Sequence, residues 1–135
     1  MKYIDKKLVI ENISIQNIAK RFGTPAYCYS YNQLKQNIKN FKKNFKSFSP
    51  LICFSVKSNT NISLIREIKK FGLGADVVSV GELMMAIKAG ISPKKIVFSG
   101  VGKTSNEIKY AIDKKILLIN AESKSEIKEI EKIAK

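Results

Sequence analysis

Residues 51–56 read LICFSV, and this short apolar run begins the pattern from which the fold of the chain can be predicted. Three later runs have the same character: ADVVSV at 75–80, KIVFS at 95–99 and ILLI at 116–119. Continuously apolar short runs are typical of strands buried on both faces of a parallel sheet. The four runs begin 24, 20 and 21 residues apart, which leaves room for a helix after each strand.

The segments between these strands carry the signals of amphipathic helices. In residues 62–68, apolar residues form a stripe beside charged ones, as a helix on a core requires. Gly72 and Gly90 follow two of these helices, where glycine readily adopts the left-handed conformation that ends a helix. A hydroxyl residue followed three positions later by Glu or Gln predicts a capped helix start. Such pairs are Ser30/Gln33, Ser79/Glu82, Thr104/Glu107 and Ser123/Glu126.

The repeat of strand, cap, helix and glycine predicts an α/β fold with parallel strands and right-handed crossovers. An open doubly wound sheet and half of a (β/α)8 barrel both fit the repeat, since a whole barrel takes about 250 residues. Before the repeat, a helix ends at Gly23-Thr-Pro25 and a further apolar run, PAYCYS, occupies 25–30. We therefore predict an N-terminal helix and strand in residues 1–30, followed by about four βα units in residues 31–135.

The composition limits the classes of function. Lysine and arginine number 25 against 11 acidic residues, a net charge of +14 that would suit a nucleic-acid partner. The lysines are spread over helical segments, however, so we expect solvated helix faces and no nucleic-acid partner; a basic nucleic-acid-binding module is the alternative. The chain contains no histidine, which excludes Ser–His and Cys–His nucleophilic pairs and most zinc sites. We expect no metal.

The sequence predicts neither a membrane partner nor an export signal. No run approaches eighteen apolar residues, and the start MKYIDKKLVIENISI has no apolar core of a signal peptide. A cytoplasmic location is therefore expected. Cys28 and Cys53 lie far apart in apolar runs, so we expect two free, buried thiols.

Two glycine motifs resemble nucleotide-binding loops without fulfilling their requirements. GVGKT at 100–104 lies between a strand and a helix, but a phosphate-binding loop needs a glycine where Val97 stands. Gly72-Leu-Gly74 precedes a strand, whereas the glycines of a dinucleotide fingerprint follow one. We predict no nucleotide site at either motif.

Lys57 and Asp76 are the candidate functional residues. Lys57 ends the strand LICFSVK, and barrel enzymes build their active sites at the C-terminal ends of their strands. A lysine amine there can attack an aldehyde and form a covalent C=N bond, although a lysine that merely reaches water is the alternative. Asp76 interrupts an apolar strand, and an unpaired carboxylate is costly to bury. It therefore needs a cation or strong donor, such as Lys57, unless its position is open to solvent.

Five segments resemble the diaminopimelate decarboxylases and their fold-type III relatives, in the same order and with the same spacing. CFSVKSNTN resembles the Y-A-x-K-A-N segment of the cofactor-binding lysine, and GLGADVVSVGEL resembles the following G-A-D-V-V-S-x-G-E-L segment. The other three are GTPAYCYSYNQLKQNI, IVFSGVGKTSNEI and LLINAESKSEI, so that the resemblance covers residues 10–135. Ornithine-type decarboxylases and alanine racemases share the lysine motif but are less similar in the second segment.

The resemblance implies a TIM-type barrel enzyme, with residues 31–135 as the first half of a pyridoxal-phosphate-binding barrel. Lys57 would bind pyridoxal 5'-phosphate covalently, and Asp76 would lie near the lysine and the cofactor. The implied activity is decarboxylation of meso-diaminopimelate to L-lysine, in lysine biosynthesis, by a homodimeric carboxy-lyase. Another fold-type III decarboxylase or racemase, or a non-catalytic remnant, is the alternative.

The same resemblance indicates what this chain lacks. Family members place a histidine against the cofactor ring, a glycine-rich loop around its phosphate, and arginines around the substrate. This chain has no histidine, and its only arginines are Arg21 and Arg66. We therefore expect an N-terminal fragment that is inactive alone. The sequence leaves open whether it represents a truncation, one half of a split gene, or a remnant.

Overall fold

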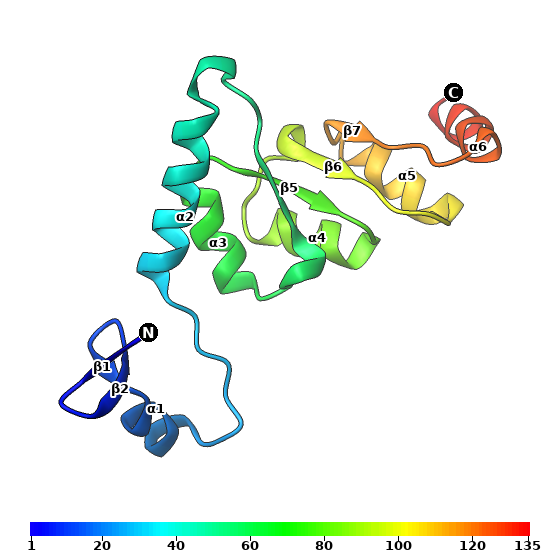
Figure 1. The fold of residues 1–135 in the computed structure, drawn as a ribbon. Helices are drawn as coiled ribbons and strands as arrows, with labels where there is room; N and C mark the ends of the chain where they lie inside the picture. Colours follow the sequence, from blue (N-terminus) through cyan, green and yellow to red (C-terminus); the bar gives the residue numbers. More distant parts are fainter. The chain divides into compact units, whose positions relative to one another are not determined.

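The computed structural model describes residues 1–135 as two compact units, Met1–Ser49 and Pro50–Lys135 (Figure 1). Neither unit contains a helix that is long and apolar enough to span a membrane.

The first unit combines a small antiparallel sheet with helices. Both hairpins of the sheet turn through two residues with positive φ, Asp5-Lys6 and Glu11-Asn12, as tight hairpin turns require. Ser14 caps the first helix with its hydroxyl, which accepts a hydrogen bond from the backbone N–H of Gln16. The elements are β1 (Lys2–Ile4), β2 (Lys7–Ile10), β3 (Ile13–Ser14), α1 (Ile15–Phe22), α2 (Tyr31–Asn44) and the 3-10 turn η1 (Lys46–Phe48).

The N-terminal region differs from the sequence prediction in its strands: the sheet of β1, β2 and β3 was not predicted, and the strand predicted in 25–30 is absent. The predicted helix is present as α1 and ends at Gly23, but the predicted strand in 25–30 is wrong, because this segment pairs with no other strand. Tyr27 is 92% exposed, and Cys28 is exposed as well, so the prediction of a buried thiol is wrong at this position. Both cysteines are free, as expected. An apolar run forms a strand only where a neighbouring strand is available for pairing, and residues 25–30 have no such neighbour.

The second unit is a four-stranded parallel sheet in the order β4-β5-β6-β7. The four predicted strands are confirmed, each shorter than its apolar run. The elements are β4 (Cys53–Ser55), η2 (Val56–Ser58), α3 (Ile62–Lys70), β5 (Gly74–Val77), α4 (Val80–Lys88), η3 (Pro93–Lys95), β6 (Ile96–Phe98), α5 (Ser105–Asp113), β7 (Leu118–Ile119) and α6 (Lys124–Ala134).

One hydrophobic core joins one face of this sheet to α3, α4 and α5. Val77 and Phe98 reach it from the strands, and Ile65, Leu83 and Ala111 reach it from the three helices. All are fully buried, and each large apolar side chain contributes about 1.5–3 kcal/mol by leaving water. Strands in sequential order with their helices on one face have the arrangement of a barrel, whereas a doubly wound sheet has helices on both faces.

The predicted caps are present at all four helix starts, but only one is a complete capping box. At α5, Thr104 and Glu107 satisfy each other's backbone N–H groups. At α4 and α6 the serine caps the helix, while Glu82 and Glu126 accept from the N–H one residue before the cap. These carboxylates therefore fasten the incoming loop to the helix.

Gly74, at the start of β5, lies where two strands approach each other closely. A Cβ on Gly74 would lie 2.1 Å from the carbonyl oxygen of Lys95 and 2.9 Å from Sγ of Cys53. The first of these atoms belongs to the backbone and cannot move independently of the sheet. Glycine is therefore required here for space.

We predict that Gly74→Ala lowers the free energy of unfolding by at least about 2 kcal/mol, because the added methyl group forces the strands apart. Gly81→Ala is the matched control, since Gly81 is exposed near the start of α4 and an added Cβ meets only Ser79 Oγ at 3.8 Å. Urea unfolding followed by circular dichroism measures both variants. Equal stability of the two variants would contradict the prediction.

Candidate functional site

Polar side chains from all four strands gather at the C-terminal edge of the sheet. Lys57 follows β4, Asp76 is the third residue of β5, and Ser99 and Asn120 directly follow β6 and β7. Backbone bonds extend the ladder to this edge, since the N–H of Ser99 donates to Val77 and that of Asn120 to Phe98. Because the strands are parallel, residues that end different strands meet at one edge.

Lys57 lies in the turn η2 between β4 and α3. Val56 before it is fully buried in the core and Asn61 caps α3 after it, so both flanks of the turn are fixed. Lys57 itself is exposed, and its ammonium forms no hydrogen bond or ion pair. The amine is therefore free to react or to bind.

Asp76 has a strong donor, and the donor is a serine. Ser99 Oγ donates to Asp76 Oδ1 at 2.5 Å, and Asn120 Nδ2 donates to Ser99 Oγ at 3.0 Å. No ion pair joins Asp76 to Lys57, although Asp76 pairs in register with Ser55, two residues before the lysine. The structure thus places Asp76 on β5 and Lys57 in the turn that follows the adjacent strand β4, with Ser99 satisfying the carboxylate.

Two further side chains share the face that carries Asp76. Cys53 lies two residues before Ser55 on β4; burial raises the pKa of its thiol, and the negative charge of Asp76 raises it further. Ser55 Oγ is buried and has no hydrogen-bond partner. A buried hydroxyl without a partner marks a place where a ligand group can still be accommodated.

Lys103, from the GVGKT segment, points inward and has no free donor. Its Nζ donates to the carbonyls of Gly100 and Asn120, at 2.6 and 2.7 Å, and lies 3.1 Å from Glu126 Oε1. The side chains of Lys103 and Glu126 are only 1% and 8% exposed. An ammonium with three donors used in this way cannot bind a phosphate, which agrees with the prediction of no nucleotide site.

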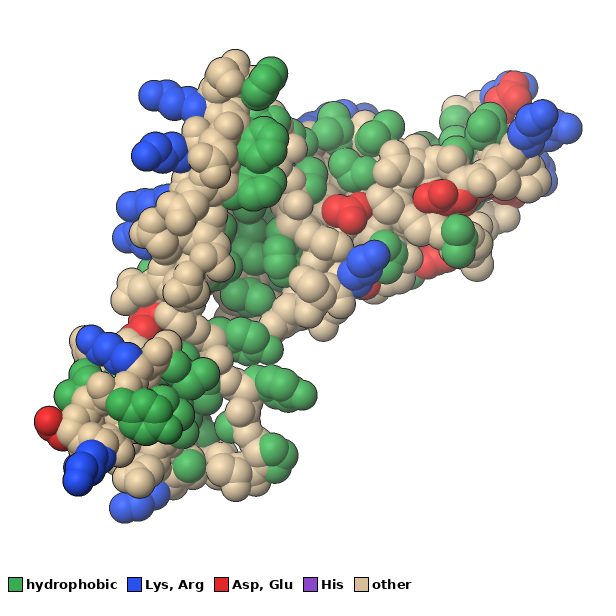
Figure 2. Space-filling model, in the orientation of Figure 1, with side chains coloured by type: hydrophobic (Ala, Val, Ile, Leu, Met, Phe, Trp, Pro, Cys, Tyr) green, Lys and Arg blue, Asp and Glu red, His purple; other side chains and the backbone are tan.

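Lys57 and Asp76 are predicted from the sequence, whereas Ser55, Ser99, Asn120 and Lys103 have no predicted role. Ser99 and Asn120 could have been found from their position, because each is the first residue after a parallel strand. Nothing in the sequence identifies Lys103 as buried, since lysines of the same type cover the surface. Figure 2 shows lysine side chains along the exposed surface of α2.

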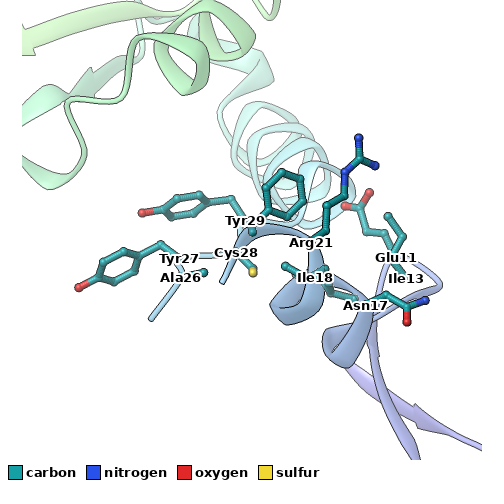
Figure 3. Close-up of a pocket in the computed structure, with 11 residues that line it drawn as sticks. Glu11, Ile13, Asn17, Ile18, Arg21, Ala26, Tyr27, Cys28 and Tyr29 are labelled. Atoms are coloured by element: carbon teal, nitrogen blue, oxygen red, sulfur yellow. The ribbon is translucent and has the colours of Figure 1, made fainter. Parts of the chain in front are cut away.

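A separate cavity of about 710 Å³ lies within the first unit, among residues 10–29 (Figure 3). Arg21, Asn17 and Glu11 line it together with apolar and aromatic side chains. The hydroxyl of Ser30 and the N–H of Asn32 both donate to Glu11, and these two hydrogen bonds lower the pKa of its carboxyl. Its lining contains neither Lys57 nor Asp76.

Comparison with known proteins gives one family. Residues 31–135 match the family described as "Pyridoxal-dependent decarboxylase, pyridoxal binding domain". The diaminopimelate decarboxylase of Aquifex aeolicus is 44% identical over 134 residues, which are 99% of this chain and 31% of that protein.

Solved structures agree. The diaminopimelate decarboxylase of Helicobacter pylori, crystallised with L-lysine, superposes with a TM-score of 0.84 at 43% identity, over 87% of this chain and 30% of that one. The enzyme of M. jannaschii, in complex with L-lysine, gives a TM-score of 0.93 at 35% identity, over 96% and 31%. The chain thus spans a little under a third of the length of these relatives.

Hydrogen bonds to the Glu107 carboxylate make the stability of the fold depend on pH. Backbone N–H groups of Thr104 and Val80 donate to its carboxylate and lower its pKa in the folded state. As the pH falls, the Glu107 carboxylate of the unfolded chain therefore takes up a proton before that of the folded chain does. The contribution of the charged carboxylate to the free energy of unfolding is fully present above about pH 4.5 and is lost as the pH falls through the folded-state pKa.

We expect Glu107→Gln to be less stable than the wild type at pH 6, because an uncharged amide accepts backbone bonds less strongly. The difference should shrink as the pH falls from 5 to 3, when the wild-type carboxylate becomes protonated. Urea midpoints at each pH measure it, and a difference independent of pH would refute the role given to this carboxylate.

Proposed function

Because this chain belongs to the pyridoxal-dependent decarboxylases, we propose that it is the N-terminal part of an enzyme that converts meso-diaminopimelate to L-lysine and carbon dioxide. The observation that carries the proposal is the free amine of Lys57 at the C-terminal edge of the sheet, in a chain that is 44% identical to the diaminopimelate decarboxylase of Aquifex aeolicus. L-Lysine in the complexes of two such relatives supports the choice of substrate.

The residues at the sheet edge fit pyridoxal phosphate. An aldehyde cofactor needs an accessible primary amine, and Lys57 is exposed and has no partner. It also needs polar groups that are not already saturated, and Ser55 Oγ has an unused hydrogen-bonding capacity beside the β5 carboxylate. Lys57 would hold the cofactor through its Nζ, with Asp76 on the adjacent strand.

The cofactor, when bound, supplies an electron sink for the electron pair left on the α-carbon as carbon dioxide departs. The chain itself supplies attachment and electrostatics. Lys57 fixes the position of the bound group, since the turn that carries it is held by Val56 in the core and by Asn61 at the start of α3. The Asp76 carboxylate, on the adjacent strand, would favour a positive charge on the Lys57 nitrogen.

We further propose that residues 31–135 form the first half of a closed barrel into which residues 1–30 lead. The two outer strands, β4 and β7, each have a free edge, and the sheet face opposite the helices carries the polar residues of the site. Both features suit a sheet completed by further strands. A homodimer is the assembly that the family resemblance implies.

Attachment of the cofactor to Lys57 can be tested directly. We expect sodium borohydride reduction of the chain mixed with pyridoxal phosphate, followed by peptide mapping, to label Lys57 above the many other lysines. Lys57→Arg retains the charge without a reactive primary amine and should lose that label. Lys88→Arg, at an exposed lysine of α4, is the matched control and should retain it. Preferential labelling of another lysine would refute the assignment.

The 135-residue chain should not decarboxylate diaminopimelate by itself. Two carboxylates of the substrate and the phosphate of the cofactor require cationic or N–H donors at the site; Lys57 would be occupied by the cofactor itself, and Lys103 already has three partners. Carbon dioxide release and lysine formation would be measured beside the Aquifex aeolicus enzyme as a positive control. Turnover by the purified chain would show that the missing groups are dispensable.

A further inference from the structure

We propose that Ser99 and Asn120 are positioning residues that orient the Asp76 carboxylate toward the amine of Lys57. The inference rests on the proposed function and adds two residues to it. Both lie directly after strands, and both belong to one hydrogen-bonded series that ends at Asp76.

The direction of the protons in this series follows from its donors. Asn120 donates an amide hydrogen to Ser99 Oγ, so that oxygen acts as an acceptor there. A serine hydroxyl has one hydrogen, and Ser99 donates it to Asp76 Oδ1. Asp76 therefore accepts through Oδ1, and its second oxygen stays available for another partner. A carboxylate held by one oxygen in this way has fewer orientations open to it than a free one.

Asn120 is itself fixed from two sides. Its N–H donates to the Phe98 carbonyl, which continues the ladder beyond β7. Its own carbonyl accepts from Lys103 Nζ at 2.7 Å, and that ammonium is held by the Gly100 carbonyl and by Glu126. The buried ion pair between Lys103 and Glu126 thus anchors the backbone of Asn120, and the side chain of Asn120 orients Ser99.

The geometry places Asp76 one strand from Lys57 but does not join them by an ion pair. Without Ser99, the carboxylate would be free to rotate about its side-chain bonds. With Ser99 and Asn120 in place, the negative charge is fixed at the sheet edge where Lys57 emerges. Such preorganisation favours a positive charge on the Lys57 nitrogen when it bonds to an aldehyde.

The test uses the concentration of pyridoxal phosphate that half-saturates borohydride labelling of Lys57, measured by mass spectrometry of the lysine peptide. We expect Ser99→Ala to raise it about tenfold, which corresponds to about 1.4 kcal/mol, close to the lower end of the roughly 1.5–3 kcal/mol of a hydrogen bond to a charged group. Ser99→Thr, which keeps the hydroxyl, should stay within about twofold of the wild type. Asn120→Asp keeps the size of the side chain but removes the donor to Ser99, and should raise the concentration as well.

Two controls separate positioning from general damage to the fold. Ser105→Ala removes a comparable serine-to-carboxylate bond, from Ser105 Oγ to Glu129 at 2.7 Å between α5 and α6, and should leave labelling unchanged. In an Asp76→Ala background, Ser99→Ala should have no further effect, because the residue acts only through that carboxylate. Urea unfolding of each variant shows that the comparison is made between folded chains.

The outcomes are distinguishable. A wild-type chain that is not preferentially labelled at Lys57 overturns the proposed function and this inference with it. Two results overturn the inference alone, provided that the wild type is labelled at Lys57. In the first, Ser99→Ala leaves the half-saturating concentration unchanged. In the second, Ser99→Ala raises that concentration equally whether or not Asp76 is present. Loss in Ser99→Ala, recovery in Ser99→Thr and no further loss in the Asp76→Ala background support it.

Discussion

Each crossover in the second unit returns the chain to the next strand of the sheet, in the same direction, with its helix on the same face. Strand side chains alternate between faces, so every second residue enters the core beneath α3, α4 and α5. On β5, Ala75 and Val77 enter the core, and Asp76 between them faces the opposite side. The alternation of side chains along the strands therefore produces both the hydrophobic core on one face and the polar residues of the site on the other. A shift of register by one residue would bury the carboxylate and expose Val77.

The loop after β6 shows how one lysine can serve structure in a chain that is rich in lysine. Lys103 is surrounded by two carbonyls and a carboxylate, and its ammonium lies 5.8 Å from the centre of the Phe98 ring. A buried ion pair costs desolvation energy, and it is tolerated when every donor has a partner. Here all the donors are used within the protein. The result ties the loop after β6, the end of β7 and the start of α6 to one another.

Much of the fold could be predicted from the sequence, because its local signals agree with one another. The four apolar runs became parallel strands, and all four hydroxyl caps start helices. The strand expected in 25–30 failed because pairing is not a local property: Tyr27 extends into solvent with no partner strand. The sheet of β1, β2 and β3 was not predicted either. Its strands are short and half exposed, so they lack the continuous apolar pattern from which the other strands were predicted.

The site could be predicted only in part. Lys57 and Asp76 were identified because each is chemically out of place in an apolar run. Ser99 and Asn120 are ordinary polar residues at strand ends, and their importance appears only when parallel strands bring them to one edge. Contacts between residues some twenty positions apart depend on register, and register is set by packing across the whole sheet.

Glu107 has a consequence for the dynamics of the molecule. One of its oxygens accepts from Val80 at the start of α4, and the other accepts from Thr104 at the start of α5. If either loop opens, the Glu107 carboxylate is displaced, and the other loop then loses its hydrogen bond to the same carboxylate. Amide exchange at Val80 and at Thr104 should then report a single local unfolding event, in which the starts of α4 and α5 open together as one cooperative unit.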